Sequence, residues 1–145
     1  MADEAAAAAV ATRFAECAAP PCVIWLQGDL GAGKTLFARA FIHALGYEGY
    51  VKSPSYGLLE TYHAGGVKVL HLDLYRIEDP EELEFLALRD LFDAGTVLLV
   101  EWPDRGGSLL PAADLVLHFF EQGEERRIRC EPLSPAGAAL AAKTA

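Results

Sequence analysis

Hydrophobic and polar positions alternate along the chain in patterns that predict both strands and helices. Two short runs, at 23–27 and 96–102, are almost entirely apolar, which is typical of parallel strands buried on both faces of a sheet. Two further segments place a glycine-containing turn between stretches of strand character, and these segments predict β-hairpins. The predicted hairpins span 57–75 and 115–131, and the predicted helices span 3–18, 34–45 and 79–92, followed by a short helix that begins at 134–135.

The predicted helix over 79–92 opens with an N-terminal signature, in which Asp79 caps the first turn and Pro80 takes its first position. Its apolar residues fall on two faces, whereas a surface helix needs only one. The helix is therefore expected either to be buried on both sides or to present one face to a partner. The two faces consist of Leu83, Leu86, Ala87 and Leu91, and of Phe85, Leu88 and Phe92.

The length of the chain indicates how many domains it has, and its net charge limits the kinds of molecule it is expected to bind. The 145 residues favour a single domain over 1–145, because domains cluster near this size. The formal net charge is −9, which argues against a broad, sequence-independent grip on nucleic acid, since phosphate binding relies on clustered Lys and Arg. An acidic chain can still dock on a basic protein partner.

The cysteines, the lengths of the apolar runs and the N-terminus predict the cellular compartment of the protein. The three cysteines show no CxxC spacing and predict reduced thiols rather than a disulfide framework. In the second hairpin, alternation is expected to turn Ile128 and Cys130 inward and Arg127 and Arg129 outward. No apolar run reaches the length of a membrane span, and the acidic N-terminus lacks the basic region of a signal peptide. We expect a soluble, cytoplasmic protein without membrane contact.

The segment GDLGAGKT at 28–35 carries the strongest chemical signal. It matches G-x-x-x-x-G-K-[ST], the phosphate-binding P-loop, and it lies between a predicted strand and a predicted helix, as the motif requires. Its glycines permit close backbone approach to phosphates, Lys34 would reach the β- and γ-phosphates, and the Thr35 hydroxyl would ligate Mg²⁺. The fold class predicted is α/β, a P-loop NTPase-like three-layer fold whose mixed sheet has parallel core strands and β-hairpins. The expected nucleotide-contacting residues here are Gly28, Asp29, Leu30, Gly31, Ala32, Gly33, Lys34, Thr35 and Leu36.

Two apolar runs end in a carboxylate, Asp73 in one and Glu101 in the other, and both resemble the strand that carries the magnesium-binding acid of P-loop enzymes. Asp73 is the shorter acid and suits Mg²⁺ held through water, whereas Glu101 reaches farther and suits an attacking water. Spacing alone leaves these roles exchangeable. The chain contains no asparagine, so it lacks the Asn-Lys-x-Asp element that reads guanine, and this favours ATP. Trp102 could stack on adenine, cap the pocket or simply pack in the core.

Four segments together resemble one family. GDLGAGKT, VKSPSY at 51–56, HLDLYR at 71–76 and VEWP at 100–103 follow the order and spacing of the bacterial tRNA threonylcarbamoyladenosine biosynthesis ATPases, the TsaE (YjeE) family. The resemblance covers about residues 20–131. It implies that Lys34 acts on the phosphates, that Thr35, Asp73 and Glu101 are the magnesium residues, and that Glu101 is also the catalytic carboxylate. Ser55 stands where the family usually has threonine, and it keeps a hydroxyl for a phosphate or metal contact.

The resemblance also implies a pathway. The family's ATPase activity supports N6-threonylcarbamoylation of adenosine 37 in tRNA, with partners that resemble a transferase subunit and its dimerising paralogue (TsaD and TsaB). The chain would then meet tRNA only indirectly, through that complex. No arginine stands out in the sequence as a finger for the γ-phosphate, so slow ATP hydrolysis by the isolated chain is expected.

Two other functions remain open from the residues. A small-molecule kinase would share the P-loop but needs phosphate-clamping arginines and an acceptor pocket, for which the candidates are Arg105, Arg126, Arg127 and Arg129. A solvated hairpin face is the plainer interpretation of the last three. A non-catalytic nucleotide-binding module would turn over no ATP through Glu101. Arg76 is expected to act as a phosphate or partner contact or as a surface ion pair, and His71 as a strand residue whose ring has a hydrogen-bond partner.

Overall fold

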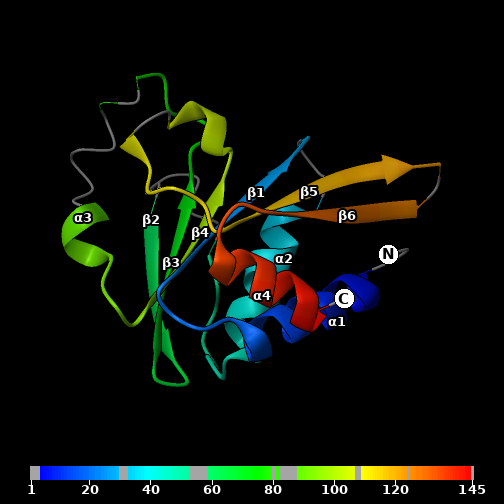
Figure 1. Ribbon diagram of the computed structural model, residues 1–145, viewed down its shortest axis with the longest axis horizontal. Helices are drawn as coiled ribbons and strands as arrows, with labels where there is room; N and C mark the ends of the chain where they lie inside the picture. Colours follow the sequence, from blue (N-terminus) through cyan, green and yellow to red (C-terminus); the bar gives the residue numbers. More distant parts are fainter. Residues whose placement is uncertain are drawn as a thin grey trace.

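A mixed six-stranded sheet organises the chain in a computed structural model, which describes residues 4–29, 33–52, 59–79, 81, 88–106, 109–123 and 125–144 (Figure 1). The strands are β1 (Cys22–Gly28), β2 (Leu59–Ala64), β3 (Val67–Asp73), β4 (Thr96–Glu101), β5 (Leu115–Gln122) and β6 (Glu125–Pro132). The helices are α1 (Glu4–Cys17), α2 (Lys34–Ala44), α3 (Leu88–Leu91), the 3-10 helix η2 (Pro103–Arg105) and α4 (Pro135–Thr144).

The order of the strands across the sheet is β2-β3-β4-β1-β5-β6. The four central strands β3, β4, β1 and β5 are parallel, and each outer strand pairs with its neighbour as an antiparallel hairpin. β4 is buried along its whole length, as a continuous apolar run predicts for a strand covered on both faces. This arrangement confirms the predicted α/β fold with parallel core strands and flanking hairpins.

Two apolar clusters cover the two faces of the sheet. On one face, α1, α2 and α4 pack together and bury side chains of the central strands, among them Ile24 and Leu99. Phe37 lies at the centre of this layer and meets the rings of Phe14 and Phe119 edge to face. On the other face, Leu70, Leu98 and neighbouring residues pack against Leu88 of α3 and against Leu110.

Most predicted elements agree with the structure to within one or two residues, including both hairpins and the helix after the P-loop. Asp79 accepts a hydrogen bond from the backbone N–H of Glu81 at 3.0 Å, as its predicted capping role requires. Of the predicted helix over 79–92, α3 describes the last turn, whereas Pro80 and residues 82–87 lie outside the described residues.

Cys130 contradicts its predicted place in the interior, because its side chain is exposed. It shares a sheet face with Ile128, which is half-buried against the cluster under the helices, so the alternation itself is right. β6 is the last strand of the sheet, and alternation sets the direction of a side chain but not whether another element covers it. Arg127 and Arg129 are exposed, as predicted.

None of the helices in the described ranges combines the length and the apolar character that a membrane span requires.

Candidate functional site

The predicted chemical residues gather at the carboxyl ends of the parallel strands. Gly28 ends β1, Asp73 ends β3 and Glu101 ends β4, and Asp73 and Glu101 are direct partners in the parallel register. β1 and β4 are themselves neighbours, with Leu26 opposite Glu101. This edge is where open α/β sheets hold their ligands, because the strand ends and the following loops converge there.

The described parts of the phosphate loop show why glycine is needed at both of its ends. A Cβ built on Gly28 would lie 2.5 Å from the carbonyl oxygen of Phe119, so β5 approaches too closely for any side chain. Gly33 precedes α2 with φ 102° and ψ 11°, a left-handed conformation that side chains disfavour. Asp29 is exposed and Leu36 half-buried. Leu30, Gly31 and Ala32 lie outside the described residues, and so does Ser55.

Lys34 opens α2 and is 4 % exposed. Its Nζ donates a hydrogen bond to the carbonyl oxygen of Gly28 at 2.5 Å and lies 3.5 Å from the centroid of the Trp102 ring. Burial lowers the pKa of Lys34, and the negative charges of Glu101 and Asp73 oppose that shift. The ammonium is therefore a desolvated cation beside the phosphate loop, where an anionic ligand would replace the water it has lost.

Glu101 is 2 % exposed, and its Oε1 accepts a hydrogen bond from the Thr35 hydroxyl at 2.8 Å. Because Thr35 lies in the first turn of α2, this bond ties the end of β4 to the helix that follows the phosphate loop. Asp73 is 7 % exposed, and its Oδ1 accepts a hydrogen bond from the backbone N–H of Tyr75. Burial raises the pKa of Asp73, and the charge of Glu101 adds to the shift.

His71 belongs to this site, whereas the sequence predicts only a strand residue whose ring has a hydrogen-bond partner. Its side chain is completely buried, and its Nε2 lies 2.6 Å from Oε2 of Glu101. His71 stands two positions before Asp73, so both side chains leave β3 on the same face. That His-x-Asp spacing was the signal in the sequence, but the partner of the ring follows only from the pairing of β3 with β4.

Trp102 follows Glu101 and has φ 59° and ψ 51°. Among the residues that the structure describes, it is the only one other than glycine with a positive φ. A side chain in this region costs on the order of 1–3 kcal/mol, so surrounding contacts must hold it there. The indole covers the Lys34 ammonium on its face and meets the Tyr75 ring at 5.0 Å between centroids. The Arg105 guanidinium lies 5.7 Å from the Trp102 ring. Trp102 therefore lies over the lysine of the phosphate loop.

The oxygen atoms at this edge suit magnesium. Thr35 offers a hydroxyl and Asp73 and Glu101 offer carboxylates, and Mg²⁺ in proteins prefers one or two carboxylates together with phosphate oxygens and water. Within the described ranges, no group of three or more His, Cys, Asp or Glu side chains forms a metal site on its own. A metal held here would thus need ligand phosphates to complete its shell.

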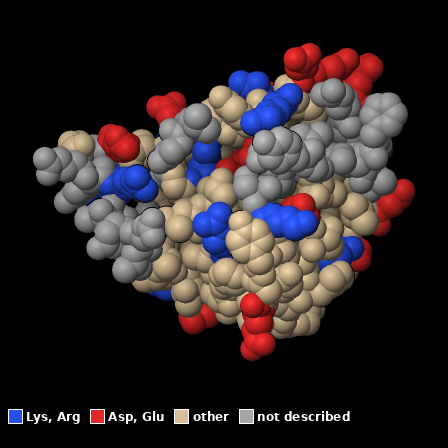
Figure 2. Space-filling model, turned by 180° about the vertical axis from the view of Figure 1, so that it is seen from behind, with Lys and Arg blue, Asp and Glu red and all other residues tan. Residues whose placement is uncertain are grey.

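One of the candidate arginines, Arg126, lies close to the end of the phosphate loop. A Cβ built on Gly33 would lie 4.0 Å from Nη1 of Arg126, so the β5–β6 hairpin brings this guanidinium beside the start of α2. Arg76 is exposed after β3. In the view of Figure 2, Lys and Arg side chains are spread over the surface, several of them near its middle, and most Asp and Glu side chains lie along its rim.

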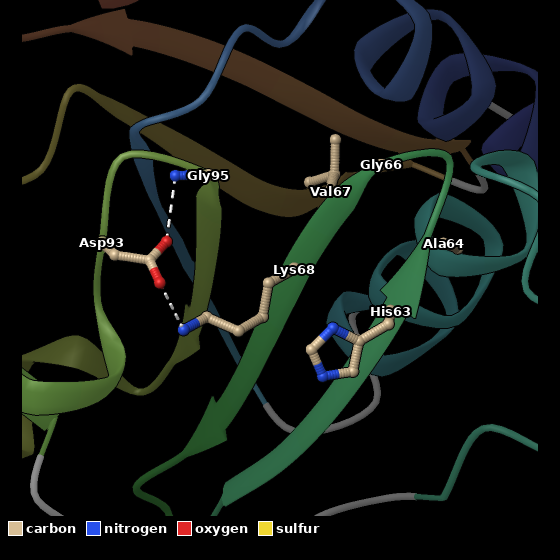
Figure 3. Close-up of a pocket in the computed structure, with 7 residues that line it drawn as sticks. All are labelled: His63, Ala64, Gly66, Val67, Lys68, Asp93 and Gly95. Carbon is tan, nitrogen blue, oxygen red and sulfur yellow. Dashed lines mark hydrogen bonds and ion pairs between the residues drawn. The ribbon is translucent and has the colours of Figure 1, made fainter.

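Described residues also line surface hollows outside this cluster of acids. One, of about 470 Å³, borders the site, since Gly28 lines it together with Phe119 and Arg129. The other, of about 620 Å³, lies at the opposite end of the sheet, where Lys68, Asp93 and Gly95 line it (Figure 3). The second hollow shares no residue with the predicted phosphate site.

Comparison with known proteins gives a consistent result. The family model described as "Threonylcarbamoyl adenosine biosynthesis protein TsaE" matches residues 1–128. The tRNA threonylcarbamoyladenosine biosynthesis protein TsaE of Haemophilus influenzae is 43% identical over 106 residues, which cover 73% of this chain and 67% of that protein. The protein of the same name from Bacillus subtilis is 38% identical over 119 residues, covering 82% of this chain and 74% of its own length.

A solved structure is also similar. The crystal structure of YdiB from Bacillus subtilis superposes with a TM-score of 0.83 at 28% sequence identity, covering 99% of this chain and 90% of that one.

Proposed function

Because the chain belongs to the TsaE family of tRNA threonylcarbamoyladenosine biosynthesis proteins, we propose that it binds ATP with Mg²⁺ and hydrolyses it to drive a transferase complex in this pathway. The observation that carries the proposal is the hydrogen bond between Thr35 and Glu101. It joins the first turn of the helix after the phosphate loop to an acid at the end of a parallel strand, as a metal-dependent nucleotide site requires.

The residues of the site divide the work among them. Lys34 would neutralise the β- and γ-phosphates, since its desolvated ammonium lies beside the phosphate loop. The Thr35 hydroxyl and Asp73 would hold Mg²⁺, which would supply positive charge to neutralise the phosphates. Glu101, held by a hydrogen bond from Thr35, would orient the attacking water near that metal. The trapped position of Trp102 over Lys34 would exclude bulk water from this end of the site.

The family context extends the proposal to partners. The chain would act on a transferase subunit and its dimerising paralogue, resembling TsaD and TsaB, which modify adenosine 37 of tRNA. It would meet tRNA through that complex, in keeping with a net charge of −9. Its turnover of ATP would be slow in isolation and faster in the complex, where a partner completes the site.

The test compares wild type with Glu101→Gln, alone and with the two partner proteins. We expect Glu101→Gln to bind ATP with near wild-type affinity by calorimetry but to release phosphate about 100- to 1,000-fold more slowly, the scale on which losing one oriented catalytic group acts. Threonylcarbamoyladenosine in tRNA, measured by mass spectrometry, would fall in parallel. Glu131→Gln, a half-exposed acid on β6, serves as the control and should match wild type.

Three outcomes would contradict the proposal. Absence of ATP binding by the wild type would remove its premise. Unchanged phosphate release by Glu101→Gln would favour a nucleotide-binding module without catalysis. Equal turnover by the isolated chain and the assembled complex would contradict the role of the partners.

A small-molecule kinase is the second candidate, and the observation in its favour is the guanidinium of Arg126 beside Gly33. Kinases commonly place arginines on the transferred phosphate. Incubation of the protein with labelled ATP and a panel of metabolites decides between the two. Transfer of label to an acceptor would favour the kinase, whereas release of inorganic phosphate alone favours the ATPase.

A further inference from the structure

We propose that His71 is a positioning residue, which fixes the orientation of the Glu101 carboxylate through a hydrogen bond from its Nε2–H. The proposal rests on the proposed ATPase function for its catalytic consequence, but its geometric part stands independently. The bond joins the middle of β3 to the end of β4 over 2.6 Å, between two side chains that are both buried.

The surroundings of the ring argue that it is held there for this bond. Val69 on the same strand and Leu99 on β4 share its face of the sheet, and both belong to the apolar cluster that packs under α1 and α2. An imidazole placed in such a layer pays a desolvation cost that an aliphatic side chain would avoid. Its hydrogen bond to Glu101 offsets part of that cost, and it also aims the carboxylate.

The same geometry selects the tautomer of the ring. Within the part of the chain that the structure describes, Nδ1 of His71 is buried without a hydrogen-bond partner. A proton on Nδ1 would be a buried donor without an acceptor, whereas an unprotonated Nδ1 leaves only an acceptor unpaired, which is less costly. A ring with its proton on Nε2 therefore fits the site, and Nε2–H donates to Oε2 of Glu101.

The consequence for Glu101 is that both of its oxygens are held. Oε1 accepts from the Thr35 hydroxyl at 2.8 Å and Oε2 accepts from His71 at 2.6 Å. A glutamate has three side-chain torsions, and one hydrogen bond would leave the carboxylate free to rotate about the remaining contact. Two bonds from different elements, α2 and β3, fix its plane before any ligand arrives, which is what preorganised sites require.

The kinetic test compares His71→Leu, which removes the donor, with His71→Gln, which retains an N–H donor of similar reach. We expect His71→Leu to lower kcat by about 10- to 100-fold, the usual cost of losing a group that orients a catalytic ligand. The dissociation constant of ATP should change less than about threefold, because the hydrogen bond of His71 is to Glu101 and not to a residue of the phosphate loop. His71→Gln should recover most of the lost kcat.

Val69→Ala is the matched control. Val69 lies on the same strand, on the same face and in the same apolar layer, and its truncation lowers the free energy of unfolding without removing a hydrogen bond to Glu101. Equal losses of kcat in Val69→Ala and His71→Leu would overturn the proposal, and so would a loss of ATP affinity in His71→Leu as large as its loss of kcat.

A second readout uses the nucleotide-free protein and needs no activity. Nitrogen-15 NMR of the histidine rings, with the His71 signals identified by their absence in His71→Gln, should show a proton on Nε2 of His71. Its ring proton should resonate far downfield, and Glu101→Leu should remove that shift. A His71 ring protonated at Nδ1 instead would overturn the proposal. Failure of the wild type to bind ATP would contradict the proposed function and leave this result unaffected.

Discussion

A lysine and an aspartate lie at each end of the parallel sheet. The surroundings shift the pKa of the aspartate in opposite directions at the two ends. At the amino end, Lys68 pairs with Asp93 at 2.9 Å, and the exposed Asp93 carboxylate also accepts hydrogen bonds from Thr96 and Gly95 (Figure 3). These bonds lower the pKa of Asp93 to about 2. At the carboxyl end, burial lowers the pKa of Lys34 and raises the pKa of Asp73.

The difference separates a structural ion pair from the candidate ligand site. Asp93 has its partners in place and gains from being charged, so it stabilises the loop before β4. Asp73 and Lys34 are buried with fewer compensating contacts, and each is held in a state that costs free energy in the absence of a ligand. Perturbation by burial inside a cluster of charges is the pattern expected of functional groups.

Replacing each of the two lysines separately should give the largest difference between the two ends of the sheet, measured as ATP affinity. Lys34→Ala is expected to weaken ATP binding by about 10- to 100-fold, because it removes charge-assisted hydrogen bonds to phosphate. Lys68→Ala should leave the affinity within about twofold, since Lys68 lies at the other end of the sheet. Calorimetric titration with ATP and Mg²⁺ measures both. Similar losses in the two variants would show that the carboxyl end is not the nucleotide site.

Replacing one glycine at each end by alanine should give a smaller difference, measured as the free energy of unfolding. Gly28→Ala places its Cβ 2.5 Å from a backbone oxygen of Phe119, whereas Gly66→Ala meets no atom within 4 Å. Both glycines have positive φ, so both variants carry a conformational cost. Gly28→Ala should lose about 1–3 kcal/mol more free energy of unfolding, the usual cost of overpacking. Urea denaturation checks this, and equal losses would contradict the close approach of β5.

Neutralising Asp73 should stabilise the ligand-free protein. Because burial raises the pKa of Asp73 in the folded state above its value of 3.8 in the unfolded chain, the charged form opposes folding at neutral pH. Asp73→Asn retains the acceptor for the Tyr75 N–H, so the melting temperature at pH 7 should rise slightly while phosphate release falls. Thermal unfolding and phosphate release test the two parts, and a lower melting temperature would contradict the first.

Asp93→Asn should change the melting temperature least of these variants, and it should lower that temperature where Asp73→Asn raises it. The lowered pKa means that Asp93 contributes stability above about pH 3.8, and that this contribution is lost as pH falls toward about 2. The variant should therefore melt slightly lower than wild type at neutral pH, and the difference should vanish near pH 2. Phosphate release should not change. A difference between the two proteins that is constant with pH would contradict this assignment.

The sequence predicted the parts of the site better than their contacts. The P-loop spacing, the two acids that end apolar runs and the hairpins around them all follow from local patterns, because each depends on residues close together in the chain. The place of Asp73 opposite Glu101 depends on β3 pairing with β4 in parallel, and local patterns do not encode that pairing. The bond from His71 to Glu101 and the approach of Arg126 to Gly33 depend on the same long-range order.

The errors have equally physical causes. Alternation places Cys130 inside because it assigns faces, yet an edge strand can leave either face uncovered. The three roles of Trp102 stay open in the sequence, because a tryptophan does not signal the left-handed backbone that brings the indole over Lys34.

The contact between Trp102 and Lys34 also gives the protein an optical property. The chain has two tryptophans, and the ring of one lies 3.5 Å from an ammonium at the phosphate loop. Indole emission depends on the electric field across the ring, so movement of that ammonium toward a phosphate would change the emission of Trp102. Trp25, the second tryptophan, lies on β1. Binding of a phosphate at the loop would thereby change a fluorescence signal that needs no added label.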